Sequence, residues 1–192
     1  GLYTDLFLQN YNIKKVIMFE PQEEIFNFLK KKYNKDKRIK IYNRAVSNKN
    51  SQQSLKLNHH DLTTTLSAFN DGSFYLRLKA ILFGVKKMTY KKVKIKTIKL
   101  DNIFKKKEIH KIDLLKIDTE GHELEVLLGL DKKIKKVKWI LIEFHHDEIY
   151  LKYNPKKIHN YLLKNNFILE SRFKFPFTTW EDRIYFNNNE NR

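Results

Sequence analysis

The stretch Ile112–Leu128 reads IDLLKIDTEGHELEVLL and joins a strand, an acidic turn and a helix in immediate succession. Residues Ile112–Ile117 form an apolar-rich run that is typical of a strand covered on both faces. The leucines of Leu124–Leu128 then fall at the i, i+3, i+4 spacing of a helix face that packs on a core. Thr119 is the expected N-cap of that helix. Strand, short turn and helix in this order form the repeating unit of parallel α/β sheets.

The same alternation extends outward along the chain. Further strands are expected at Val16–Phe19, Ile39–Tyr42, Ser54–Leu57, Val93–Ile98 and Trp139–Ile142. Helices are expected to begin near Pro21 and Pro155, because proline is tolerated in a helix's first turn, and after Asp101 as a cap. The sequence therefore predicts an α/β fold with a mostly parallel sheet.

The C-terminal region departs from this alternation. Phe167–Leu169 and Ile184–Phe186 are expected to form a terminal pair of strands, which adds an antiparallel strand to the sheet. No linker or repeat interrupts the chain. We therefore expect one domain over residues 1–186, followed by a polar, frayed tail over residues 187–192.

The composition describes a folded and strongly basic chain. Hydrophobic residues make up 41% of its 192 residues, which excludes a disordered chain, and the absence of cysteine excludes disulfides and thiolate metal sites. The net charge of +17 would attract phosphate, anionic lipid or acidic sugar. Lysines lie on nearly every segment and arginine is scarce, so compositional drift is favoured over a nucleic-acid surface. With no long apolar run and no signal peptide, a cytoplasmic location is expected.

Three of the expected strands end on a carboxylate, namely Glu20, Asp118 and Glu143. In open parallel sheets, ligands bind beyond the carboxyl ends of the strands, so we expect the three acids at one edge of one sheet. A carboxylate after the second strand of such a sheet typically receives the hydroxyls of a ribose. The alternative for each acid is a solvated position near a helix N-terminus.

These positions carry a resemblance to the FkbM family of methyltransferases. Phe19-Glu20-Pro21 resembles the family's FEP signature, and Leu100-Asp101 its TLD-type element, with Lys99 in place of the threonine. Lys116–Glu123, followed by Leu127 and Gly129, is similar to the KIDxEGxE…LxG signature, which is the most specific of the motifs.

Weaker matches complete the resemblance, which runs from Gly1 to about Phe186. Ala45-Val46-Ser47 resembles the turn after the family's third strand, and Ile142-Glu143 the acid that ends the next strand. The resemblance implies a Rossmann-like class I methyltransferase sheet and S-adenosylmethionine as the cofactor.

The resemblance also implies a missing element. The family begins with a strand and a glycine-rich DxGANxG turn whose backbone N–H groups contact the methionine part of the cofactor. Gly1-Leu2-Tyr3-Thr4 looks like the last glycine of that turn and the helix that follows. The first central strand is therefore expected to be absent from the sheet.

Cofactor-binding residues follow from the same resemblance. Gly1, Glu20, Pro21, Ala45 and Asp118 are expected to contact S-adenosylmethionine, with Glu20 accepting hydrogen bonds from both ribose hydroxyls. Asp118 is also expected to be catalytic, by orienting the acceptor or taking its proton. The alternative is that Asp118 only holds the turn at Gly121.

Glu143 and His145 complete the expected catalytic set, and Glu120 is the expected substrate-binding residue. The ordinary pKa of histidine lies near neutrality, which suits His145 to proton transfer. A partly buried imidazole bonded to a neighbour remains the alternative for His145. For Glu120 and Glu123 the alternative is that they are solvated acids favoured by the helix dipole.

Two histidine pairs raise the question of a metal. They lie in His59-His60-Asp61 and His145-His146-Asp147. Adjacent residues on a strand point to opposite faces, so neither pair chelates an ion simply. No metal site is expected from these motifs.

The expected function is S-adenosylmethionine-dependent O-methylation of a small-molecule or saccharide hydroxyl. A nucleic-acid methyltransferase or basic nucleic-acid-binding domain is the first alternative, because of the positive charge. An NAD-dependent dehydrogenase is the second, because an acid after the second strand suits both ribose-containing cofactors.

Overall fold

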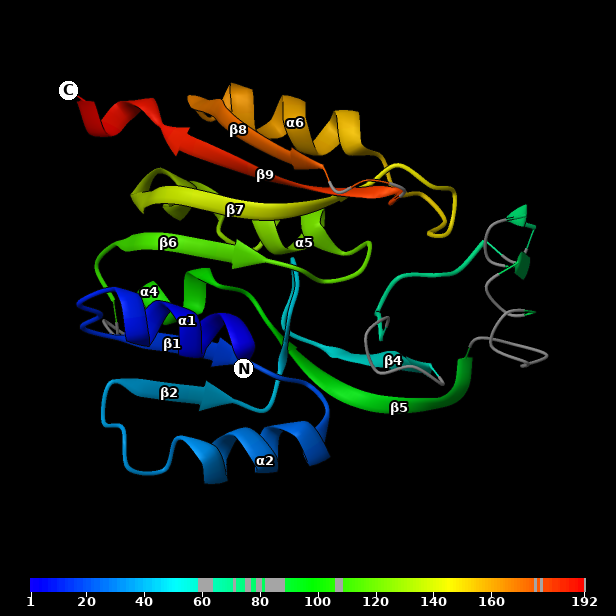
Figure 1. Ribbon diagram of the computed structural model, residues 1–192, viewed down its shortest axis with the longest axis horizontal. Coiled ribbons are helices and arrows are strands. Elements are labelled where there is room, and N and C mark those ends of the chain that lie inside the picture. The colour runs from blue at the N-terminus through cyan, green and yellow to red at the C-terminus, as the bar shows by residue number, and fades with distance from the viewer. Residues whose placement is uncertain are drawn as a thin grey trace.

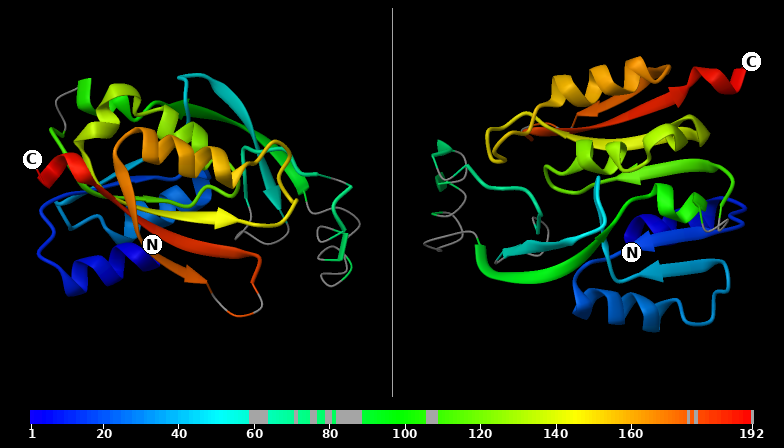
Figure 2. Two further views of the ribbon diagram at one scale, coloured as in Figure 1. Left: turned by 90° about the horizontal axis from the view of Figure 1, so that it is seen from above. Right: turned by 180° about the vertical axis from the view of Figure 1, so that it is seen from behind.

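The computed structural model describes residues 1–58, 64–70, 72–74, 77–78, 81, 89–105, 109–174, 176 and 178–191. The motif His59-His60-Asp61 lies outside these residues. Figure 1 shows the strands stacked side by side, with helices on their faces, and Figure 2 gives the views from above and from behind.

The N-terminal part is a pair of parallel strands with two helices. Helix α1 spans Leu2–Asn10, strand β1 Val16–Phe19, helix α2 Glu23–Lys32 and strand β2 Ile39–Tyr42. β1 and β2 pair in parallel over four residues each. Both strands have the predicted bounds, because short apolar runs flanked by polar residues mark them clearly.

The middle part is a separate sheet with the strand order β3-β5-β4. Strand β3 spans Ala45–Val46, β4 Gln52–Asn58 and β5 Thr89–Ile98. β5 pairs in parallel with β3 and antiparallel with β4, which is an edge strand. The short helix α4, Asp101–Lys105, follows β5.

The C-terminal part is a sheet with the strand order β6-β7-β9-β8. Its elements in chain order are β6 Ile112–Ile117, α5 Glu123–Leu128, the 3-10 helix η2 Asp131–Lys136, β7 Val137–His145, α6 Pro155–Lys164, β8 Phe167–Lys174, β9 Trp180–Asn187 and the 3-10 helix η3 Asn188–Asn191. β6 and β7 are parallel, whereas β9 is antiparallel to both of its neighbours. The predicted terminal strand pair is confirmed.

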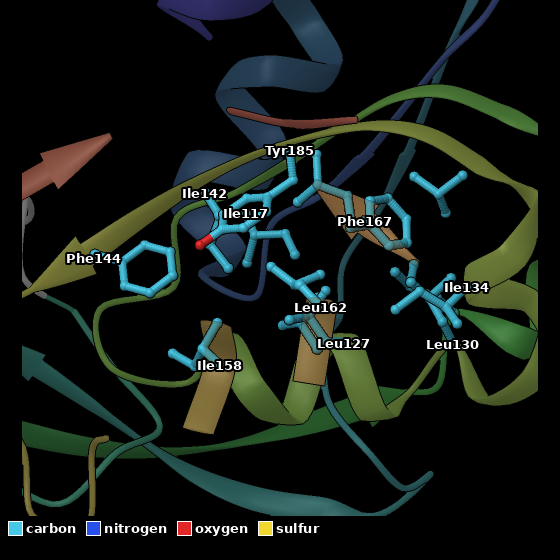
Figure 3. Packing of buried hydrophobic residues seen from close by; sticks show 14 of the residues in the cluster. Ile117, Leu127, Leu130, Ile134, Ile142, Phe144, Ile158, Leu162, Phe167 and Tyr185 are labelled. Atoms are coloured by element: carbon cyan, nitrogen blue, oxygen red, sulfur yellow. The ribbon is translucent and has the colours of Figure 1, made fainter. Parts of the chain in front are cut away.

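The main core lies between the C-terminal sheet and helices α5 and α6 (Figure 3). Along β7, alternate side chains point into it, and Ile140, Ile142 and Phe144 are fully buried. On the opposite face of β7, Trp139 packs against Phe186 of β9 with ring centroids 4.6 Å apart. The alternation leaves Glu143 and His145 on this second face.

The α/β fold is confirmed, but the expectation of one mostly parallel sheet is only partly met. β1 pairs with β2 and β6 with β7, while β1 and β6 do not pair with each other. In Figure 1, β1 and β6 run in the same direction with α1 beside them. Helix α1 contacts both strands, because Thr4 lies 3.7 Å from the sulfur of Met18 and the Lys116 ammonium lies 4.2 Å from the ring centre of Tyr3. Among the described residues, no strand lies between β1 and β6.

Three local expectations are corrected. Thr119 is not the N-cap of α5, which begins at Glu123 after His122. Pro21 lies before α2 and not in its first turn, since Gln22 is the N-cap. The tail begins later than predicted, because Asn187 is a buried residue of β9 whose side-chain amide donates to the carbonyl of Val137.

Among the residues that the structure describes, no helix is long and apolar enough to cross a membrane.

Candidate functional site

Glu20 directly follows β1 and is held in one orientation. Its backbone N–H donates to the carbonyl of Tyr42, which continues the pairing of β1 with β2. Its Oε1 accepts a hydrogen bond of 2.8 Å from the backbone N–H of Gln22, the N-cap of α2. Burial raises the pKa of the Glu20 carboxyl, against the opposing effect of that hydrogen bond. A partly desolvated, oriented carboxylate at a strand end suits an acceptor of ligand hydroxyls.

The other predicted cofactor residues lie in different settings. Gly1 is the N-cap of α1. Pro21 is partly buried in the turn between β1 and α2. Ala45 is buried in β3 and packs with Leu55 of β4, so a contact with a cofactor would have to come from its backbone.

Asp118 lies beyond β6, on the face of the C-terminal sheet that α1 covers. Its Oδ2 is 2.7 Å from the ammonium of Lys116, which also lies over the ring of Tyr3. On β7 the neighbouring acid is Glu143, and Asp182 of β9 stands directly opposite Glu143 in the pairing register. Adjacent strands therefore bring three carboxylates together with a lysine.

Glu143 and His145 form a close pair. They are two residues apart on β7, and His145 Nε2 lies 3.3 Å from Glu143 Oε1 and 3.9 Å from Glu120 Oε2. Burial, followed by repulsion from Asp118, Glu120 and Asp182, raises the pKa of Glu143 to about 8. The structure thus joins the predicted catalytic residues to the predicted substrate residue Glu120. Glu143 does not end its strand as predicted, because β7 continues to His145.

Glu120 reaches this cluster from a tightly held turn after β6. Glu120 and Gly121 have φ angles of 53° and 89°, so two successive residues adopt the left-handed region. The hydroxyls of Thr65 and Ser67 donate to the carbonyls of Glu120 and Gly121 at 2.5 Å and 2.7 Å. A Cβ on Gly121 would lie 2.5 Å from Cγ of Tyr150, so only glycine fits there.

Two residues that hold this turn, Glu123 and Tyr150, have roles that the sequence did not indicate. Glu123 is fully buried, and its Oε1 accepts from the backbone N–H groups of Thr119 and Gly121 and from the Thr119 hydroxyl, each at 3.1 Å. Burial raises the pKa of Glu123 to about 7. The alternative of a solvated, dipole-favoured acid is therefore wrong for Glu123. Its carboxylate holds the turn together by accepting these hydrogen bonds.

Tyr150, in the loop after β7, is the second such residue. Its hydroxyl donates a short hydrogen bond to Glu120 Oε2, and its ring packs edge-on against His145 with centroids 5.0 Å apart. Burial raises the pKa of Tyr150, so the hydroxyl keeps its proton and remains a donor. No motif surrounds Tyr150, so the sequence offered no signal for it.

His145 and His146 point to different carboxylates, as adjacent residues on a strand are expected to do. His146 Nε2 lies 3.2 Å from Glu181, which also binds Arg172 and Arg183. His146 therefore belongs to a structural ion network away from the Glu143–His145 pair.

A cavity of about 370 Å³ adjoins the turn on its helix side. Residues that line it include Ser67, Gly121, His122, Leu124, Lys152 and Tyr153. His122 is partly buried there, with Nε2 3.0 Å from the hydroxyl of Ser47, and burial lowers its pKa to about 4. His122 is consequently a neutral hydrogen-bonding group near pH 7.

Acids at or near the carboxyl ends of parallel strands lie where open α/β sheets bind their ligands. A family model described as "Methyltransferase FkbM domain" matches residues 2–169. This chain belongs to the FkbM methyltransferase family, and S-adenosylmethionine is accordingly its cofactor. The family match decides against the NAD-dependent dehydrogenase considered from the sequence.

Individual relatives cover the chain unevenly. The hexuronic acid methyltransferase AglP of Haloferax volcanii is 41% identical over 51 residues, which are 27% of this chain and 21% of that protein. The crystal structure of a methyltransferase FkbM from Methylobacillus flagellatus KT matches 96% of this chain and 40% of its own, with 17% identity and a TM-score of 0.56. That likeness supports the fold. The TrmK structure of M. capricolum, in complex with S-adenosyl-homocysteine, is more distant, with 15% identity and a TM-score of 0.41 over 98% of this chain and 69% of its own.

Proposed function

We propose that this chain transfers a methyl group from S-adenosylmethionine to a hydroxyl of a small-molecule or saccharide acceptor. The observation that carries the proposal is the placement of acidic groups on strands that run in the same direction. Glu20 follows β1, Asp118 follows β6, and Glu143 and His145 lie in the last three residues of β7 (Figure 1). One group of residues then serves the cofactor and the other serves the acceptor.

Glu20 serves the nucleoside end of the cofactor. Its carboxylate is oriented by the Gln22 N–H and is partly desolvated, so it is ready to accept hydrogen bonds from two ribose hydroxyls. Pro21 fixes the backbone of the turn that follows Glu20. These residues fit the nucleoside part of S-adenosylmethionine.

Asp118 serves the transfer step. The bound cofactor supplies an electrophilic methyl group on a sulfonium, and the protein supplies alignment and removal of water. Asp118 would accept the proton that the acceptor hydroxyl loses on methylation. The Asp118 side chain is 40% exposed and its partner Lys116 holds it in place, so an acceptor can reach it.

Glu120, Glu143 and His145 orient the acceptor oxygens. They are polar groups on one well-held surface next to Asp118, which is the arrangement needed to align a hydroxyl. The similarity to a hexuronic acid methyltransferase supports a sugar acceptor. The net charge of +17 supports an acidic one, because a positive surface concentrates anions.

Calorimetric titration with S-adenosylmethionine tests the cofactor half of the proposal. Glu20→Ala should weaken binding by about 1.5–3 kcal/mol, the usual range for a lost hydrogen bond to a charged group. Glu24→Ala is the matched control, because Glu24 is an exposed glutamate of the adjacent helix. Unchanged affinity in Glu20→Ala would remove Glu20 from the site.

Release of S-adenosylhomocysteine tests the acceptor half. With uronic-acid-containing oligosaccharides as acceptors, Asp118→Asn should lower turnover while leaving affinity for the cofactor close to that of the wild type. Equal losses in turnover and cofactor affinity would assign Asp118 a merely structural role.

A further inference from the structure

We propose that Glu120, Glu143 and His145 form a binding site for a divalent metal cation. In catalysis the cation would hold the acceptor's oxygens next to Asp118, and that role rests on the proposed function. Binding of the cation rests only on the geometry of the three side chains.

The three ligand atoms already lie at nearly the separations that a metal requires. One atom from each residue lies within 4.8 Å of the others. His145 Nε2 is 3.3 Å from Glu143 Oε1 and 3.9 Å from Glu120 Oε2. Ligands about 2.0–2.2 Å from an ion lie roughly 3.0–3.5 Å from one another, so the His145–Glu143 separation already fits, and the separations to Glu120 need to shorten by roughly 0.4–1.3 Å to close the site.

The ligands stand on well-fixed backbone. Glu143 and His145 share one face of β7, which is hydrogen-bonded on both sides by β6 and β9. Glu120 is held by the Thr65 hydroxyl at its carbonyl and by the Tyr150 hydroxyl at its carboxylate. A partner that orients a ligating carboxylate in this way is typical of protein metal sites.

Burial separates this cluster from ordinary surface acids. The side chains of Glu120, Glu143 and His145 are only 17%, 15% and 6% exposed. A buried imidazole nitrogen directed at two buried carboxylates is a donor set that surface acids do not provide.

The local charge favours a cation. Asp118, Glu120 and Asp182 all repel a negative charge on Glu143, and the opposing Lys116 is already paired with Asp118. Carboxylates gathered out of water are costly without a compensating positive charge. This concentration of negative charge occurs in a chain whose net charge is +17.

The donor set also indicates the kind of metal. Imidazole favours transition metals, and carboxylates suit manganese, so Mn²⁺ and Zn²⁺ fit better than Ca²⁺. Three protein ligands leave coordination positions open for oxygens of an acceptor. A cation at this point would also let an acidic sugar approach Asp118 and Glu143 without direct repulsion between anions.

Neighbouring residues in the sequence do not indicate this site. The sequence argued that the adjacent residues His145 and His146 cannot bind the same ion. The structure agrees, since His146 points to Glu181. The proposed site takes only His145 from that pair. Its partners are two residues back on β7 and 25 residues back in the turn after β6.

The test is a titration of chelator-stripped protein with MnCl₂ in the absence of S-adenosylmethionine, followed by the paramagnetic resonance signal of free Mn²⁺. We expect one saturable site that Zn²⁺ displaces. Glu143→Gln and Glu120→Gln should each weaken Mn²⁺ binding by at least tenfold, because they keep side-chain shape but remove a charged ligand. His146→Gln is the matched control and should bind as the wild type does.

Two results would overturn the proposal, namely no saturable binding of either metal, or binding that neither Glu143→Gln nor Glu120→Gln weakens. Circular dichroism confirms the fold of each variant, and either amide variant suffices if the other is unstable. Titration of metal-free protein with S-adenosylmethionine is independent of these outcomes. If the protein binds the cofactor but not Mn²⁺, only the proposed metal site is contradicted. If it binds Mn²⁺ but not the cofactor, only the proposed function is contradicted.

Discussion

The N-terminal and C-terminal regions of this molecule differ strongly in how many side chains they bury. In residues 1–42, all of which the structure describes, Leu29 is the one buried side chain, and helix α1 buries none. The C-terminal sheet with α5 and α6 encloses a continuous core of fully buried residues (Figure 3). The region that carries Glu20 therefore rests on little apolar burial, whereas the region that carries Glu143 and His145 is rigid.

This difference has a functional meaning. Aligning an acceptor requires groups fixed within a fraction of an ångström, and the acceptor cluster is built on paired strands. A region with few buried contacts opens locally at low cost. In the proposed function, the region around Glu20 can therefore adjust as the cofactor enters, while the cluster around Glu143 stays in place.

The largest expected effect is on stability in the core. Leu127→Ala should lower the free energy of unfolding by about 2–5 kcal/mol, because Leu127 is fully buried and its loss leaves a cavity. The matched substitution is Leu6→Ala in α1, where the side chain is 47% exposed. It should change the free energy of unfolding by about 0.5 kcal/mol or less. Urea unfolding followed by circular dichroism compares them. Similar costs would erase the contrast between the two regions.

The second effect concerns the buried acid of the turn. Since the pKa of Glu123 is raised to about 7, the folded state keeps a proton that the unfolded chain releases, and stability falls as pH rises from about 4.5 to about 7. The loss is on the order of 3 kcal/mol. Glu123→Gln should remove it, because glutamine keeps the acceptor for Thr119 and Gly121 but does not ionise.

Other groups around Glu123 determine how this effect is measured. The pKa values of Tyr150 and Tyr153 are raised, so neither ionises between pH 4.5 and 7. His122 acts in the opposite sense, since burial lowers its pKa to about 4. The quantity to follow is therefore the difference in unfolding free energy between wild type and Glu123→Gln. A difference that does not vary with pH would mean that Glu123 is ionised in the fold throughout.

The smallest expected effect on stability is that of adding a methyl group to Gly121 in the turn after β6. Gly121→Ala should cost about 1–3 kcal/mol, because alanine is strained at a φ of 89° and its Cβ would overlap the Tyr150 ring. Gly72→Ala is the control, since Gly72 is exposed and its nearest neighbour would lie 3.3 Å from the added Cβ. Thermal unfolding measures both, and a harmless Gly121→Ala would show that the turn is not fixed.

Local patterns predicted most elements of this fold. The bounds of β1, β2 and β6 follow from short apolar runs, and α6 begins at Pro155 as expected. The predicted start of α5 at Thr119 was wrong because the Thr119 side chain does not cap the helix. Instead, the side chain of Glu123, four residues later, accepts a hydrogen bond from the backbone N–H of Thr119. The chain therefore makes a turn where helix was expected.

The candidate site was predictable in its members but not in its arrangement. Acids at strand ends indicated Glu20, Asp118 and Glu143 one by one. Asp118 and Glu143 come together through the parallel pairing of β6 with β7, whereas Glu20 follows β1 in a separate sheet. The register of β7 against β9 adds Asp182 opposite Glu143. The grouping also depends on a tyrosine 30 residues from Glu120 in the chain. Such contacts between distant residues leave no periodic trace in a sequence.

The packing of Trp139 on Phe186 has a practical consequence for anyone who studies this protein by fluorescence. The chain has two tryptophans, Trp139 on β7 and Trp180 on β9, and both belong to the C-terminal sheet. Tryptophan emission therefore reports on that sheet alone. In a molecule whose first 42 residues had come loose, both tryptophans would still lie in a paired sheet, so the far-ultraviolet signal of α1 and α2 is the more direct measure of that change.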